Sequence, residues 1–265
     1  KAQTKGGSIN GEFILKNLNN YFLNSQFTSS WDLAEVNQYF KDSPFIGLRG
    51  TLLTNTSYKG NIAFDIRFKN MFLNARHKSD VTVKNIKFNY KLFPLKFSFK
   101  SIDCKLDKHK ILINSCQSTI SETDINFKGE ILNLIPYILG GAPKIYVDGN
   151  IRSTYTNFSE FMTLGGISDD NKKGEEKTIM PNWVDANTII DVKNFSYENF
   201  IASDLNGVIS YKKGKINGKN LNALSLNGEI AGEFTLSEPI RKNLKLVSNI
   251  ALKKINIRNS FDAFN

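Results

Sequence analysis

The residue types that carry out metal or acid–base chemistry are few in this chain and widely spaced. His77 and His109 each lack a second ligand at metal-binding spacing, so we interpret both as surface histidines and predict no metal site. Four carboxylates are expected at solvent-facing strand positions or in turns, where nothing selects a catalytic pair: Asp103, Asp124, Glu130 and Asp148. The sequence contains no phosphate-binding glycine loop and no nucleophile elbow. We therefore predict that the protein is not an enzyme and uses no cofactor.

The two cysteines, Cys104 and Cys116, flank a hairpin-like segment at 106–110. In an oxidising compartment they could form a cross-strand disulfide. Two small buried thiols are the equally supported alternative, because free cysteine behaves as a small apolar residue. The residues alone support both interpretations.

Large apolar side chains are far more prominent than reactive ones, and the sequence contains 20 Phe. Eight apolar residues on strand-like segments are the candidate lining of a lipid-binding groove: Phe88, Tyr90, Phe97, Phe99, Ile111, Ile113, Ile125 and Phe127. An ordinary sheet core is the alternative. We favour the groove because a sheet must bury its apolar face, and this sequence offers little helix to cover it. Long uncovered apolar stripes are typical of binding sites.

Alternation of apolar and polar residues indicates β-strands along most of the chain. Val81, Val83 and Phe88 follow this period of two, with one slip near Asn85 that indicates a bulge. The short turn at 107–109 favours antiparallel neighbours.

Helical signals are short and few. Ser30 or Asp32 is expected to cap a helix over 33–40, and a turn or two is expected over 132–139. We therefore predict a mainly β fold: an elongated, curled antiparallel sheet, forming a half-barrel or groove of repeated units with a few short helices.

A phrase of Gly, Glu and an apolar residue occurs three times, at Gly11, Gly129 and Gly232. Internal repetition of this kind indicates a protein built from similar units placed end to end. We expect each glycine to mark a bend or bulge in a strand. The predicted organisation is the end of an upstream β repeat with a short helix (1–50), a β repeat unit (51–164), a flexible linker (165–182) and a second repeat unit (183–265).

The net charge of +10 raises the question of nucleic-acid binding. The basic residues are scattered and alternate with apolar ones, as at Lys84 and Lys87, so they are expected on solvent-facing sides of strands. No basic cluster resembles the footprint of a nucleic-acid module. We therefore predict no nucleic-acid partner.

No apolar run approaches the roughly 18–20 residues that span a bilayer.

The order of these motifs resembles the C-terminal periplasmic region of the AsmA family of bacterial envelope proteins. The resemblance covers nearly the whole chain and rests on five segments taken together: Val83 to Tyr90, Asn126 to Ile131, Asn133 to Gly140, Asp148 to Ile151 and Phe158 to Phe161. It implies a periplasmic protein held to the inner membrane by an anchor N-terminal to this segment. It supplies no catalytic residues.

The resemblance also implies a function. The expected role is binding of phospholipid or another acyl lipid in a β groove, aiding lipid transport between the inner and outer membranes or outer-membrane homeostasis and biogenesis. The alternative is a structural scaffold that assists outer-membrane protein assembly without a lipid conduit. The envelope proteins that would serve as partners are not identified by the sequence.

Overall fold

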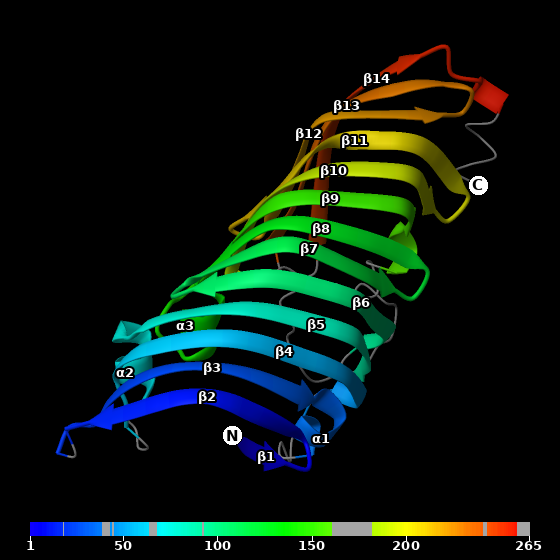
Figure 1. The fold of residues 1–265 in the computed structure, drawn as a ribbon. Coiled ribbons are helices and arrows are strands. Elements are labelled where there is room, and N and C mark those ends of the chain that lie inside the picture. Colours follow the sequence, from blue (N-terminus) through cyan, green and yellow to red (C-terminus); the bar gives the residue numbers. More distant parts are fainter. Residues whose placement is uncertain are drawn as a thin grey trace. The chain divides into compact units, whose positions relative to one another are not determined.

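The computed structural model describes residues 1–17, 19–38, 43, 45–63, 68–91, 93–160, 182–240 and 243–258. Most of these lie in strands, and the strand order follows the sequence from β1 to β14 (Figure 1). None of the helices in this described part has the length and apolar character needed to cross a membrane. Contacts group the chain into two compact units, residues 1–118 with 128–145 and residues 119–127 with 146–265.

The first unit is built from long antiparallel strands. They are β1 (Ala2–Thr4), β2 (Gly7–Lys16), β3 (Phe22–Asp32), β4 (Phe45–Asn61), β5 (Arg76–Tyr90) and β6 (Phe93–Asp107), followed by β7 (Lys110–Ile120) and β8 (Thr123–Leu132), which contribute residues to both units. The strand pairings from β1 to β6 are all antiparallel. Between β6 and β7 the chain reverses at Lys108, whose φ of 54° is the left-handed conformation of a tight turn. The predicted turn at 107–109 is confirmed.

In the described part of this unit, three helices interrupt the strands: α1 (Leu33–Asn37), α2 (Phe68–Asn74) and α3 (Leu134–Ile138). Asp32 caps α1 as predicted, accepting a hydrogen bond from the Ala34 amide at 2.8 Å. The predicted turn around 132–139 is α3. Strand alternation gives no hint of α2, which the sequence analysis missed.

The slip near Asn85 is a β-bulge. Arg49 pairs with Lys87 and Thr51 with Lys84, so β5 has one more residue than β4 over this stretch. Asn85 has a φ of 54°, which accommodates the extra residue. The long strands arch along their length (Figure 1), and a bulge of this kind adds local bend and twist.

The second unit contains β9 (Ile145–Asn157), β10 (Val184–Tyr197), β11 (Phe200–Lys212), β12 (Lys215–Ser225), β13 (Gly228–Ile240) and β14 (Asn243–Lys253). From β10 to β14 every pairing is antiparallel. The mainly β class, with a few short helices, is therefore confirmed.

The prediction of a wholly antiparallel sheet is wrong at β9 and β10. Their side-chain contacts advance together along both strands: Asn187 to Asp148, Arg152 to Asp191, Asn194 to the Thr154 carbonyl, and Tyr155 to Ser196. This is the order expected of parallel neighbours, which makes the sheet mixed. Parallel strands require a long connection, and the chain between β9 and β10 supplies one. Of the predicted linker at 165–182, all but Asn182 lies outside the described residues.

Two glycines of the repeated phrase, Gly11 and Gly232, allow neighbouring strands to approach closely. A Cβ on Gly11 would lie 2.2 Å from the Gln26 carbonyl oxygen, and one on Gly232 would lie 2.3 Å from that of Asn249. The β2–β3 register is unbroken through Gly11, so of the predicted bend or bulge the bulge does not occur there. At Gly232 the register shift belongs to the neighbouring strand β12.

Candidate functional site

The strands of the first unit align their side chains in rows that cross the sheet. One row joins Trp31, Leu52, Val83 and Ile102 through successive cross-strand pairs. Because side chains alternate along a strand, residues two positions away share this face, which we call the inner face. The bulge at Asn85 shifts the alternation by one residue, so beyond it the inner face continues at Phe88. Exposed residues between them, such as Asp103, belong to the opposite, outer face.

Five aromatic rings gather at one end of the inner face, and we call them the aromatic cluster: Phe45, Phe88, Tyr90, Phe97 and Phe99. The Phe88 ring is stacked on Phe97, with centroids 5.1 Å apart and planes 9° apart, and lies 6.1 Å from Phe99. Phe45 meets Phe88 edge-on at 5.0 Å and lies 5.8 Å from Tyr90. Phe88 and Phe97 are direct cross-strand partners. Stacked and edge-to-face pairs of this kind stabilise a sheet beyond the area they bury.

The aromatic cluster is only half covered. Phe45 is 38% exposed, and the other four rings are of intermediate burial. Rings under a complete second layer would be fully buried. Among the described residues the buried apolar side chains are few, and several are alanines: Tyr58, Ala63, Ala75, Leu95, Ile113, Ile145, Val192 and Ala202. The described part of the inner face is therefore only partly covered.

The predicted lining residues divide between the two units. Phe88, Tyr90, Phe97 and Phe99 meet in the aromatic cluster, which also contains Phe45, a residue that the sequence analysis did not single out. On β7 Ile111 is half-buried and Ile113 is 9% exposed. Ile125 and Phe127 are half-buried residues of the second unit. No predicted lining residue points fully into solvent.

Hydroxyl groups occupy the middle of the inner face, a feature that sequence alternation did not reveal. The Ser29 and Thr54 hydroxyls are 2.7 Å apart, and those of Thr56 and Ser79 are 2.9 Å apart. The Trp31 indole N–H donates to the Ser29 hydroxyl at 2.9 Å. Hydroxyls that satisfy one another cost little when they are buried beside apolar groups. The inner face is thus lined by rings at one end and by small, mutually bonded side chains in the middle.

Two carboxylates join β8 to the end of β9 in the second unit. Asp124 accepts hydrogen bonds from the amides of Thr154 and Tyr155, at distances from 2.7 to 3.0 Å, and from the Ser153 hydroxyl. Glu160 accepts from the Glu122 and Thr123 amides and from the Thr123 hydroxyl. Partial burial would raise the pKa of Asp124, but these donors outweigh it and lower the pKa. Asp124 is of intermediate burial, so its side chain links β8 to β9 while it keeps partial contact with solvent.

His77 is buried, so the prediction that it is a surface histidine is wrong. It is 4% exposed and lies under α2, with its ring stacked on Phe72 at 4.6 Å. The other histidine, His109, is exposed in the β6–β7 turn, as expected. The described residues contain no group of three or more metal-ligand-type side chains.

Cys104 and Cys116 are half-buried free thiols in the structure, so the cross-strand disulfide stays a prediction for the oxidised chain. Burial raises the pKa of both, and the nearby Asp103 carboxylate raises that of Cys104 further. The thiolate, which is the reactive form, is therefore scarce near neutral pH.

We expect iodoacetamide at about pH 8 to alkylate both thiols at least about tenfold more slowly in the folded protein than in urea, because burial limits both access and ionisation. Mass spectrometry of quenched time points measures the two rates separately. Equal rates in the folded and unfolded chain would contradict the raised pKa values.

The outer face carries the charge. Lys84 and Lys87 are exposed, as predicted, and Lys78 pairs with Asp107 at 2.8 Å between two exposed side chains. Such surface pairs contribute little to stability. The positive charge is thus spread over solvent-facing strand positions.

No protein-family model matches the chain, and the comparisons with curated proteins and with solved structures give no match either.

Proposed function

We propose that this protein is a lipid-binding groove protein of the bacterial envelope. The inner face of the first unit holds acyl chains, while the headgroups remain in water. No bond is made or broken in this role, and the protein acts by shielding apolar chains from solvent.

The half-covered aromatic cluster is the observation that carries this proposal. Phe88 and Phe97 present stacked rings on an apolar face where Phe45 remains 38% exposed. Each acyl methylene that leaves water against such a surface gains about 0.8 kcal/mol. A few methylenes over the cluster would therefore give a favourable free energy of several kcal/mol, before the cost of ordering the chain.

The hydroxyl pairs support the same assignment. Ser29 with Thr54, and Thr56 with Ser79, satisfy one another within the sheet. Because they bond to one another, they oppose a hydrocarbon chain less than unpaired hydroxyls would. Their small size also leaves more room above the sheet than leucine or phenylalanine would.

The envelope setting rests on the resemblance to the AsmA family described above. On this basis we propose a periplasmic protein, anchored to the inner membrane, that aids phospholipid transport between the two membranes or outer-membrane homeostasis. The outward-facing lysines are suited to a surface that passes near anionic headgroups.

Lipid analysis of natively purified protein tests the proposal. We expect organic extraction of detergent-free protein, followed by mass spectrometry, to yield acyl lipid in near-stoichiometric amount. A folded, lipid-free protein that takes up no phospholipid from added vesicles would overturn it. That result would favour the alternative, a scaffold for outer-membrane assembly with a dry core.

A further inference from the structure

A buried histidine supports helix α2 at the end of the inner face opposite the aromatic cluster. His77 and Tyr58 are cross-strand partners on β5 and β4. The Phe72 ring of α2 lies over both, 4.6 Å from the His77 ring and 6.1 Å from the Tyr58 ring, with interplanar angles of 23° in each case. The three rings form a stack whose outermost member belongs to the helix.

The surroundings of the His77 ring favour its neutral form. Its Nε2 lies 3.2 Å from the Lys108 carbonyl oxygen and, as the protonated nitrogen, donates to it. Its Nδ1 is buried and makes no well-formed hydrogen bond, although the Ala75 carbonyl lies close enough to favour a proton there. A second proton would therefore place a charge in a site with little solvent and one poor acceptor.

Charged groups around the ring do not compensate. They are Arg76 and Lys78 on β5, Asp107 on β6, Lys108 and His109 in the β6–β7 turn, and Lys69 on α2, with Tyr58 as the titratable group on β4. Asp107 attracts a proton to His77, but it already pairs with Lys78 at 2.8 Å. Burial is the largest influence and lowers the pKa of His77 below its usual 6.5, in spite of the two carbonyls. Any attraction of an imidazolium to the Phe72 ring is outweighed by this burial.

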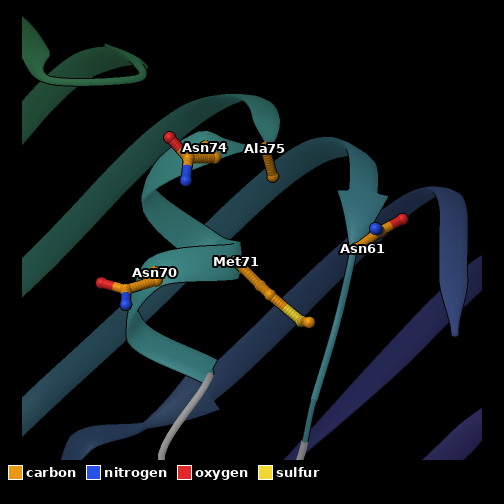
Figure 2. Close-up of a pocket in the computed structure, with 5 residues that line it drawn as sticks. All are labelled: Asn61, Asn70, Met71, Asn74 and Ala75. Carbon is orange, nitrogen blue, oxygen red and sulfur yellow. The ribbon is translucent and has the colours of Figure 1, made fainter. Parts of the chain in front are cut away.

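Among the described residues, α2 makes further contacts outside the ring stack. Ala75, which follows the helix, packs against Gly60 of β4, and Leu73 lies against Gly141. The Lys69 ammonium donates to the Gly140 carbonyl at 3.0 Å. A cavity of about 270 Å³ lies between the helix and the end of β4, lined by Asn61, Asn70, Met71, Asn74 and Ala75. Figure 2 shows Met71 reaching from the helix toward β4, while Asn70 and Asn74 point away from it. The helix is thus seated on the ring stack beside a space that it does not fill.

We propose that α2 is a proton-released cap: protonation of His77 under mildly acidic conditions detaches the helix and uncovers the Tyr58 end of the inner face. Release lets water reach the imidazolium, which the seated helix prevents. This coupling does not depend on what the inner face binds.

The direction in which pH changes the seating of α2 follows from proton linkage. A histidine whose pKa is lowered in the folded state binds its proton less well when α2 is seated than when it is released. Seating is therefore fully favoured above the ordinary value of 6.5 and weakens as the pH falls from there through the lowered value. The equilibrium can shift by no more than about tenfold for each unit of pH.

Hydrogen exchange of the whole chain tests the cap. The amide of Ala75 bonds to the Met71 carbonyl at 3.0 Å and reports on α2. After correction for intrinsic exchange, we expect its protection to fall between roughly pH 7.5 and pH 5.5, by no more than about tenfold, because His77 becomes protonated. Helix α1, which has no histidine, should keep its protection over the same range and serves as the internal control.

His77→Phe is the matched variant, because it keeps an aromatic ring in the stack and cannot titrate. Its α2 protection should not change with pH. Equal loss in the variant, or no loss in the native protein, would overturn the proposal. If the variant does not fold, NMR of the native protein decides: the midpoint of α2 release must coincide with the titration of the His77 ring. A midpoint that follows His109 instead would overturn the proposal.

Discussion

Phe88→Asp should remove most of the acyl lipid that co-purifies with the protein, by about tenfold or more relative to the native chain. The aspartate would place a carboxylate between the rings of Phe45 and Phe97, where bound methylenes are expected to lie. A charge facing hydrocarbon without a partner is costly, so the lipid should be lost before the fold is. Quantitative mass spectrometry of extracted lipid per mole of protein measures the effect.

Asn89→Asp is the control for this experiment. Asn89 is the next residue on β5, is exposed, and points to the opposite side of the strand. Its replacement adds the same charge one position away, so lipid content should stay at the native level. Equal loss from both variants would show that net charge, and not the inner face, controls lipid content. Retention of lipid by Phe88→Asp would remove the aromatic cluster from the proposal.

Much of the aromatic cluster was predictable because alternation assigns side chains to faces. Once Phe88 and Phe97 fall on apolar-alternating strands joined by a short connection, cross-strand contact follows from the pleat. The bulge at Asn85 was also visible, since it shifts the apolar phase by one residue. Alternation did not place Phe45, because its position opposite Tyr90 depends on two register shifts between β4 and β5, one extra residue in each strand.

Other features depended on information that a period of two does not contain. Alternation is the same in both chain directions, so it cannot distinguish the parallel pairing of β9 and β10 from an antiparallel one. His77 occupies a strand position that a polar residue would normally fill facing solvent, but α2 covers it. Asp124 is only partly exposed and bonds to the amides of β9. Both partners lie elsewhere in the sequence. Only the tertiary contacts identify them.

Asp124→Ala should lower the free energy of unfolding of the second unit by about 2 kcal/mol, because it leaves the amides of Thr154 and Tyr155 without their acceptor. Fully buried amides would cost more, but Thr154 and Tyr155 are exposed, so water can replace part of the loss. Urea denaturation in a Trp31→Phe background measures the change, since Trp183 then reports on the second unit.

Asp191→Ala is the matched control, because it removes a carboxylate from the same unit without orphaning an amide. Asp191 meets Arg152 at 3.7 Å with both side chains largely exposed, and its loss should cost less than about 1 kcal/mol. If both variants were equally destabilised, the position of Asp124 between β8 and β9 would have no special role.

The contribution of Asp124 should also depend on pH in a defined direction. Its pKa is lowered in the folded chain from the usual 3.8, so its ionised form stabilises the fold above that value. The stabilisation should be lost as the pH falls from 3.8 through the lowered pKa. Asp124→Asn, which keeps one acceptor oxygen but cannot ionise, should lack this dependence. The difference in unfolding free energy between the native chain and Asp124→Asn should therefore shrink with acidification, and a difference that stayed constant would contradict the amide–carboxylate clamp.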